Sequence, residues 1–246
     1  MDVALVTVGD ELLAGDTENT NATWLARRLS ARGAAVRRVL TIPDDRTVIA
    51  RWVREWAAEF DAVLVTGGLG GTHDDVTKPA VADAFDRDLV VDGGIREDVR
   101  ETARAYARQN PEMASEYDVD LDYDAQASIP EGARPLVTAE SLGPGFVIEN
   151  VYVFPGIPEE LHVMFEEVAE EFGGDVVSET LYTPAPEGAL GDRLATVRDR
   201  FDVVVGSYPG RGDTPGRVKV TGTDADAVGA ATDWLRERIT LTDPPE

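Results

Sequence analysis

The chain contains no cysteine in its 246 residues. Disulfide bonds, a thiolate nucleophile and a zinc site with thiolate ligands are therefore excluded. The chain also lacks any apolar run near the roughly 20 residues that a membrane-spanning helix needs. It begins with Met1 and Asp2 and continues directly into a strand-like segment, without the basic region and apolar stretch of a secretory signal. We expect a cytoplasmic protein with no membrane partner.

Positive charge is also in short supply. The 23 Lys and Arg residues face 47 Asp and Glu residues, which gives a formal net charge of −24, and Lys78 and Lys219 are the only lysines. This balance argues against nonspecific binding to DNA, RNA or anionic membranes, because neutralising phosphates requires a basic surface. An acidic, lysine-poor chain with 43% hydrophobic residues indicates a halophilic protein, in which dense ions screen the self-repulsion. Most carboxylates are therefore expected to be solvated surface groups.

Strand-like and helix-like segments alternate over residues 1–172. Runs of β-branched and apolar residues predict strands, and apolar residues spaced by three and four predict helices. The predicted strands are 3–8, 35–41, 62–66 and a pair within 146–154, and the predicted helices are 21–32, 47–59, 79–85 and 159–172. This alternation predicts an α/β fold, a three-layer sandwich in which helices cover both faces of a mainly parallel sheet.

Two parts of the chain depart from that alternation. Residues 87–140 are irregular, with a helical pattern around 95–108, and could form a small subdomain or flap inserted into the sheet topology. Gly173 and Gly174 indicate a domain boundary. Beyond it, a second domain (175–246) is expected to be a small α+β unit with strands 176–182, 203–207 and 217–221 and helices 188–200 and 225–239. It shows neither a basic groove nor stacking aromatic residues, so nucleic acid is not an expected partner.

The most informative segment is 66–79, with the sequence TGGLGGTHDDVTKP. It follows a predicted buried strand and leads into a predicted helix, so its backbone N–H groups and the helix N-terminus can hold an anion. The adjacent carboxylates of Asp74 and Asp75 can hold a divalent cation against phosphate oxygens. The segment is neither a Walker loop nor a G-x-G-x-x-G fingerprint. The alternative interpretation is a glycine-rich turn in which Asp74 or Asp75 only caps the helix.

Three acidic motifs follow directly on predicted strands. They are Gly-Asp-Glu at 9–11, Pro-Asp-Asp at 43–45, and the glycine loop with its two aspartates. Because ligands of parallel sheets bind at the carboxyl ends of the strands, all three motifs can converge on one edge. Oxygen ligands from different loops suit Mg²⁺, Mn²⁺ or Co²⁺ beside a pyrophosphate. The two histidines, His73 and His162, are not spaced as a metal-binding pair.

Taken together, these motifs resemble the molybdopterin-binding (MoaB/Mog) domain family. Within that family, the chain resembles the N-terminal part of the competence/damage-inducible protein CinA and the molybdopterin-binding-like region of eukaryotic FAD synthase, including the small domain that follows in both. The resemblance rests on Gly9-Asp10-Glu11-Leu12 with Gly15 and Asn19-Thr20-Asn21, on Pro43-Asp44-Asp45, on residues 66–77, on Phe154-Pro155-Gly156-Ile157-Pro158 and on Ser207-Tyr208-Pro209.

This resemblance implies three functional hypotheses. The first is metal-dependent hydrolysis of a nucleotide pyrophosphate such as ADP-ribose or FAD. The second is a molybdopterin-binding protein or an adenylyltransferase of molybdenum cofactor biosynthesis, with molybdopterin as the ligand. The third is a nucleotide-binding or scaffold protein that has lost activity. Retention of Asp44 and Asp75 speaks against the third hypothesis. Residues 72–75 and the appended small domain favour the first hypothesis over the second. The family also implies a homo-oligomer.

The resemblance further implies roles for individual residues. Asp44 and Asp75 match the two aspartates that adenylylating members use, so we expect them to be catalytic and to bind the metal. At Gly71 the chain departs from the family, which usually has proline there. The residues expected to contact a nucleotide or pterin are Gly9, Asp10, Glu11, Asn21, Thr66, Gly67, Gly68, Gly70, Gly71, Thr72, Asp74, Lys78, Pro155 and Gly156.

Overall fold

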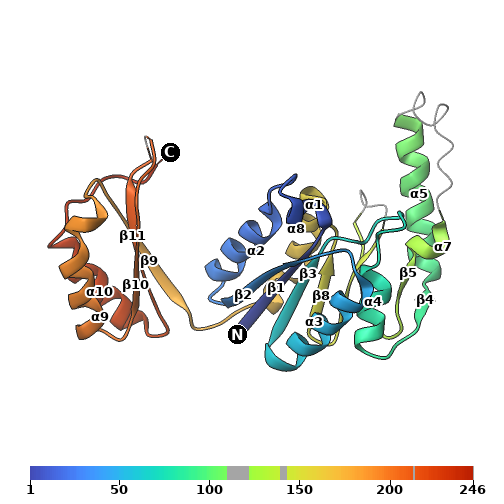
Figure 1. Cartoon of the computed structure of the whole chain (residues 1–246), viewed down its shortest axis with the longest axis horizontal. Helices are drawn as coiled ribbons and strands as arrows, with labels where there is room; N and C mark the ends of the chain where they lie inside the picture. The colour runs from blue at the N-terminus through green and yellow to red at the C-terminus, as the bar shows by residue number, and fades with distance from the viewer. Residues whose placement is uncertain (110–121, 139–142, 213, 246) are drawn as a thin grey trace. The chain divides into compact units, whose positions relative to one another are not determined.

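The computed structural model describes residues 1–109, 122–138, 143–212 and 214–245 (Figure 1). The chain forms two compact units, Met1–Gly173 and Gly174–Glu246, and each is described by itself. The division falls between two consecutive glycines. In the described residues, no helix is both long and apolar enough to cross a bilayer.

A six-stranded sheet forms the centre of the first unit, as far as its residues are described, with strand order β2-β1-β3-β8-β7-β6. Its strands are β1 (Asp2–Val8), β2 (Ala35–Ile42), β3 (Ala62–Thr66), β6 (Arg134–Leu136), β7 (Gly145–Ile148) and β8 (Val151–Phe154). The first four in spatial order run parallel. β7 runs antiparallel to both of its neighbours, β8 and β6. Only Glu149 and Asn150 separate β7 from β8, too few residues for a crossover to a parallel strand. The predicted mainly parallel sheet is confirmed.

Helices cover both faces of this sheet (Figure 1). One face carries α2 (Thr20–Ala31) and α8 (Pro158–Val168), followed by a short 3-10 helix (Ala169–Glu171), and the other carries α3 (Arg46–Glu59) and α4 (Thr77–Ala84). Successive residues of β1 alternate between the two cores, with Leu5 packed on the α2 and α8 side and Val6 on the α3 and α4 side. The predicted three-layer sandwich is confirmed.

The segment between α4 and β6, predicted as a subdomain or flap, has its own small structure. It contains β4 (Leu89–Val91), α5 (Gly93–Gln109), α7 (Tyr123–Gln126) and β5 (Ser128–Pro130). β4 and β5 form an antiparallel pair. Ile95 and Val99 of α5 are buried in the same core as α3 and α4, which anchors the segment to that side of the sandwich.

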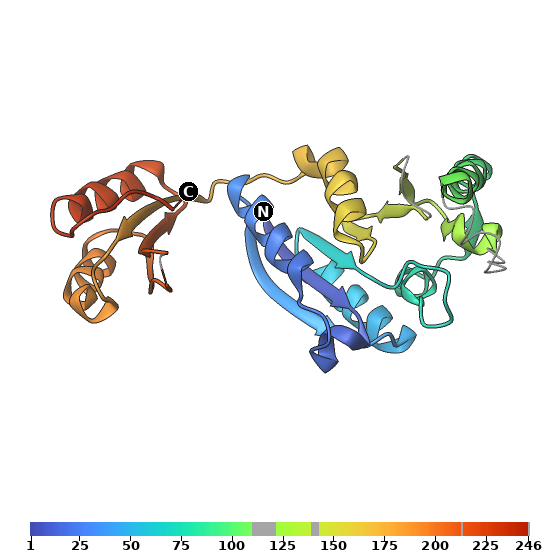
Figure 2. The ribbon, with the colours of Figure 1, turned by 90° about the horizontal axis from the view of Figure 1, so that it is seen from above.

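The second unit is a small antiparallel α+β structure, as predicted. Its sheet has the order β10-β11-β9, and two helices lie on one face of it (Figure 2). Its elements are β9 (Val177–Thr183), a 3-10 helix (Glu187–Ala189), α9 (Gly191–Arg200), β10 (Val204–Tyr208), β11 (Gly216–Gly222) and α10 (Ala225–Arg236). Val218 and Val220 of β11 pack against Leu194 and Leu235 of the two helices. Ser207 and Tyr208 therefore end a strand.

The start of the chain differs from the prediction near the expected site. Residues 10 and 11, expected in a loop, begin the short helix α1 (Asp10–Ala14), which Gly15 ends in the left-handed conformation at φ 79°. Two acidic residues in its first turn favour this helix, because they lie at the positive end of the helix dipole. α2 begins one residue earlier than predicted, since the Asn19 side chain accepts the N–H of Ala22 and caps it.

The buried face of α8 can be tested at Phe165, whose side chain is fully buried and stacks on Phe172 with ring centroids 5.5 Å apart. We expect Phe165→Ala to lower the free energy of unfolding by about 3–5 kcal/mol, because it leaves a cavity between helix and sheet. Denaturant titration in molar KCl measures the change. Val163→Ala is the matched control, since Val163 on the same helix is 50% exposed, and its effect should stay within about 0.5 kcal/mol. Equal losses would contradict this packing.

Candidate functional site

The carboxyl ends of four parallel strands meet at one edge of the first sheet. Thr66 of β3 pairs with Thr7 of β1 on one side and with Phe154 of β8 on the other, and β2 is in register beyond β1. From β1 the chain proceeds to β2 on one side, and β3 lies on the other side. This edge therefore contains the topological switch point at which open α/β sheets bind ligands. The segments that leave the sheet here begin at Gly9, Pro43, Gly67 and Pro155.

Glycine is required where β3 ends. Gly67 and Gly68 both have left-handed backbone conformations, with φ 100° and 66°. A Cβ atom on Gly67 would lie 2.3 Å from the Val8 carbonyl oxygen, and one on Gly68 would lie 2.3 Å from Thr77 Oγ1. The Gly68 carbonyl in turn accepts the N–H of Thr77, the first residue of α4. The absence of both side chains lets the loop pass between the end of β1 and the start of α4.

Asp75 holds the outer half of the glycine loop. Its Oδ1 accepts the N–H of Gly70 at 2.7 Å, and its Oδ2 accepts the N–H and the hydroxyl of Thr72 at 2.8 and 2.5 Å. A Cβ on Gly70 would lie 2.5 Å from the carboxylate, so glycine also allows this close wrap. A carboxylate has about four lone-pair positions. Three are used, and one remains on Oδ1 for a further partner.

Asp44 stands among like charges. Its Oδ2 accepts the backbone N–H of Asp10 at 2.9 Å, which joins the end of β2 to the start of α1. Burial raises the pKa of Asp44 above its usual 3.8, the hydrogen bond from Asp10 opposes this, and the charges of Asp10, Glu11 and Asp74 raise it further. A cation beside Asp44 would relieve this repulsion.

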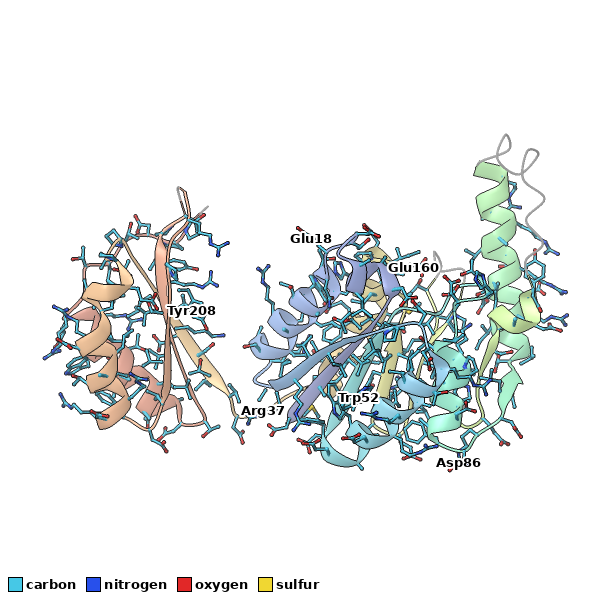
Figure 3. The ribbon with its side chains drawn as sticks, in the orientation of Figure 1. Glu18, Arg37, Trp52, Asp86, Glu160 and Tyr208 are labelled. Atoms are coloured by element: carbon cyan, nitrogen blue, oxygen red, sulfur yellow. The ribbon has the colours of Figure 1, made fainter. Side chains whose placement is uncertain are left out.

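These segments enclose a cavity of about 250 Å³. Ten residues expected to bind ligand or metal border it: Gly9, Glu11, Asn21, Asp44, Thr66, Gly67, Gly68, Asp74, Asp75 and Gly156. In Figure 3, Glu18 of the cavity lies at the same end of the unit as Glu160 near the start of α8, whereas Asp86 lies toward the opposite end. Five carboxylates line the cavity, and none of its lining residues is Lys, Arg or His.

Six expected residues lie outside the cavity lining: Asp10, Gly70, Gly71, Thr72, Lys78 and Pro155. Asp10 still contributes through its bond to Asp44, and the loop residues Gly70 and Thr72 are bonded to Asp75. Gly71, where the family usually has proline, packs against Gln126, because a Cβ there would lie 2.4 Å from Gln126 Nε2. The inserted segment thus occupies the space that a larger residue at 71 would need.

Lys78, one of the residues expected to contact the ligand, lies outside the cavity lining. Lys78 is only 6% exposed, and its Nζ donates to the Gln126 carbonyl at 2.7 Å. Burial lowers its pKa to about 8, although Asp75 opposes the shift. The lysine therefore joins α4 to α7 of the inserted segment. Sequence alone could not distinguish the two roles, since both place a lysine next to Asp75.

Four polar residues for which the sequence predicted no role line the cavity, from the end of the loop after α1 to the first residue of α2. They are Thr17, Glu18, Asn19 and Thr20. Asn19 Nδ2 donates to the hydroxyls of Thr7 and Thr41, on β1 and β2, at 2.9 and 3.3 Å. The available signal was the Asn19-Thr20-Asn21 motif, of which only the last residue had been assigned to ligand. Asn21 itself donates to the Gly156 carbonyl at 2.8 Å, which links α2 to the turn after β8.

The carboxylates gather without forming a complete metal cage. Within the described ranges, no three His, Asp or Glu side chains lie close enough together to hold a metal ion. Mg²⁺ is usually bound by one or two carboxylates, with substrate phosphates and waters completing its octahedral shell. Asp44 and Asp75 thus fit as partial ligands for a cation that arrives with an anionic substrate.

Two family models match consecutive parts of the chain. A family model described as a probable molybdopterin binding domain matches residues 4–173. The chain belongs to this family. A second model, the middle domain of FAD synthase, matches residues 175–243. The resemblance inferred from the motifs is confirmed for both parts of the chain.

Relatives and solved structures agree with this assignment. A protein of Archaeoglobus fulgidus is 37% identical over 97% of this chain and 98% of its own length. A CinA-like protein of Salinibacter ruber is 36% identical over 97% of this chain, which covers 60% of that protein. The crystal structure of CinA from Thermoplasma acidophilum, described as a protein with unknown function, is 28% identical, with a TM-score of 0.58 over 70% of this chain and 97% of that one.

The buried lysine gives a pH-dependent prediction. Between about pH 8 and 10.5 the folded chain has released the Lys78 proton while the unfolded chain still binds it, so this residue makes the free energy of unfolding rise with pH. Lys78→Met removes that contribution, and the wild type should gain on the order of 3 kcal/mol relative to the variant across this interval. Denaturant titrations at pH 7.5 and 10.5 measure it. Lys219→Met should retain the rise, and a rise retained in Lys78→Met would contradict the prediction.

Proposed function

We propose that the protein hydrolyses the pyrophosphate of a dinucleotide, such as ADP-ribose or FAD, in a reaction that requires a divalent cation. The observation that carries the proposal is the composition of the cavity at the switch point. It combines five carboxylates with the glycine turn and with the starts of two helices, and has no basic side chain in its lining. An anionic substrate can enter such a site only with a cation that offsets the carboxylates.

Asp44 and Asp75 would hold the cation, with Asp74 beside them. Asp44 has one hydrogen bond, from Asp10, and Asp75 has one free lone-pair position on Oδ1. Mg²⁺, Mn²⁺ and Co²⁺ all accept such oxygen ligands. When bound, the cation would neutralise charge on the phosphate oxygens and lower the pKa of a coordinated water.

Backbone groups would orient the pyrophosphate. The Gly68 N–H has no acceptor in the part of the chain that the structure describes, and Gly68 borders the cavity. Asn21 in the first turn of α2 lines the cavity, whereas Thr20 beside it donates its N–H to the Glu18 carbonyl at 2.8 Å and Pro158 at the start of α8 has no N–H. Helix N-termini carry partial positive charge and unpaired N–H groups, which favour phosphate oxygens. These donors stay fixed as the substrate reacts, because Asn21 and Gly68 are held by bonds to Gly156 and Thr77.

The second candidate is a molybdopterin-binding or adenylylating protein. It is favoured by the family of residues 4–173, whereas the match of residues 175–243 to the FAD synthase middle domain favours a nucleotide. Either ligand is a small molecule with phosphate and a flat ring.

A homo-oligomer, expected from the family, is part of the proposal as well, and size-exclusion chromatography with light scattering in molar KCl measures the oligomeric state.

Hydrolysis of ADP-ribose and FAD tests the function. The purified protein in high salt with Mg²⁺, Mn²⁺ or Co²⁺ should release AMP from these substrates, and phosphorus NMR measures the release. Chelation of the metal should abolish it. Asp44→Asn and Asp75→Asn should each lower kcat/KM on the order of 100-fold, as loss of one electrostatic group at a transition state does. Asp86→Asn is the matched control, because Asp86 lies toward the opposite end of the unit (Figure 3). If the wild type cleaves neither compound, hydrolysis of these substrates is wrong and molybdopterin binding becomes the leading hypothesis.

The charge cluster around Asp44 predicts a pH shift. Burial and the neighbouring carboxylates raise the pKa of Asp44, so kcat/KM should fall as pH decreases through a value above 3.8. Asp74→Asn removes one of the raising charges and should move this acid limb to lower pH. The comparison uses a fixed, subsaturating metal concentration, so that the free enzyme is titrated. If kcat/KM falls at the same pH in Asp74→Asn as in the wild type, the charge of Asp74 does not raise the pKa of Asp44.

A further inference from the structure

The first cavity is too small for a whole dinucleotide. Its volume is about 250 Å³, whereas pockets for drug-sized ligands measure about 300–1,000 Å³. ADP-ribose and FAD are at least of that size and carry bulky groups on both sides of the pyrophosphate. The proposed function places the pyrophosphate beside Gly68 and Asp44, so part of the substrate must lie beyond this cavity.

A second cavity of about 460 Å³ adjoins the first. The two share Pro158 and residues 18–20, so the starts of α2 and α8 form a common wall. Two further cavities, one beside Arg54 and Asp83 and one along α5, share no lining residue with the first. Of the cavities described, the one at the common wall can therefore receive the rest of a substrate bound at Asp44.

The second cavity contains an aromatic pair. Trp24 of α2 and His162 of α8 both line it, and their rings stack with centroids 3.9 Å apart and planes at 21°. Both residues are half-buried, and the buried Phe165 packs edge-on against Trp24 with ring centroids 5.4 Å apart. This packing holds Trp24 in place, so the rings of the pair are oriented before a ligand binds. A flat heterocycle can extend such a stack.

The same cavity contains an arginine without a partner. Arg27, one helical turn after Trp24, lines the cavity and makes no ion pair or hydrogen bond with any residue that the structure describes. Its neighbours on α2 differ, since Arg28 pairs with Glu166 and Arg32 with Glu170. In a chain with twice as many acids as bases, a free guanidinium beside an aromatic pair suits a ring edge or a phosphate oxygen.

We propose that the cavity formed by Trp24, Arg27 and His162 is the subsite for a heteroaromatic base of the dinucleotide whose pyrophosphate binds at Asp44. The subsite rests on the proposed function for its ligand class. The base stacks on the outer face of the His162 ring, because the Trp24 ring already has His162 stacked on it and the Arg28 guanidinium 5.5 Å from its centroid, and Arg27 contacts the edge of the base or the adjoining phosphate. Binding of the base then aligns the pyrophosphate with Gly68 across the common wall.

Binding of FAD with Ca²⁺ in place of the proposed catalytic cations tests the subsite separately from hydrolysis, because Ca²⁺ also takes carboxylate and phosphate oxygens as ligands and chromatography shows that FAD stays intact during the titration. Isothermal titration calorimetry of the whole chain, in high salt with Ca²⁺, gives the Kd of FAD, and competition against FAD gives that of inorganic pyrophosphate. His162→Ala should weaken FAD roughly tenfold, as loss of one base-stacking ring does, and leave pyrophosphate within twofold. Arg27→Ala should also weaken FAD, and because Arg27 is exposed we expect the variant to fold. Val163→Ala, next to His162 but outside the cavity, should bind like the wild type.

The outcomes separate the two proposals. If the two variants bind FAD selectively more weakly but the wild type cleaves neither ADP-ribose nor FAD, the base subsite is supported and only hydrolysis is overturned. Cleavage by the wild type with unchanged FAD affinity in both His162→Ala and Arg27→Ala would overturn the subsite and leave hydrolysis standing. Equal weakening of FAD and pyrophosphate would also overturn it, because a base subsite cannot act on a ligand without a base.

Discussion

The candidate site depends on how closely the chain leaving β3 passes the end of β1. At Gly67 there is no room for a Cβ atom, which would lie 2.3 Å from the Val8 carbonyl oxygen, and the backbone is left-handed. This close passage brings Gly68 against Thr77 and within reach of Asp44, whose Oδ1 lies 3.5 Å from the position of a Cβ on Gly68. Segments separated by more than 20 residues in the chain thus border one cavity. A side chain at Gly67 would separate them, and the switch point would lose its ligand-binding geometry.

Electrostatics decide what this cavity can bind. The chain carries a net charge of −24, and five of its carboxylates line the cavity without a basic side chain in its lining. Lys78, three residues after Asp75, is buried and bonded to Gln126. In the proposed function, charge balance would come from the backbone dipoles at the helix starts and from a divalent cation that binds with the substrate. The carboxylates that repel a bare phosphate are the groups that make a metal-bound one favourable.

In the proposed function, the first cavity would carry the chemistry and the second would recognise the base. Asp44, Asp75 and the glycine turn lie at the sheet edge, where hydrogen bonds fix them, whereas Trp24 and His162 lie on the helices of one face. The starts of α2 and α8 separate these regions and belong to both. An aromatic subsite on rigid helices can supply affinity without adding charge near the phosphates. This arrangement suits a dinucleotide, which has flat rings and a charged centre, and the match of residues 175–243 to the FAD synthase middle domain is compatible with it.

The fold class, most helices and strands, and the sheet edge that carries the candidate site could be predicted from the sequence alone. Periodicity predicted the strands and helices because each buries one face, and strand ends followed by acids and glycines indicated the switch point. Only the tertiary structure decided what each polar group does. Asp75 folds the loop around itself, Lys78 is buried, and Asn19 joins β1 to β2, through bonds to residues up to 48 positions away. Local patterns carry the burial preference of a segment, but they do not carry the distances between segments, and those distances select the partner of each side chain.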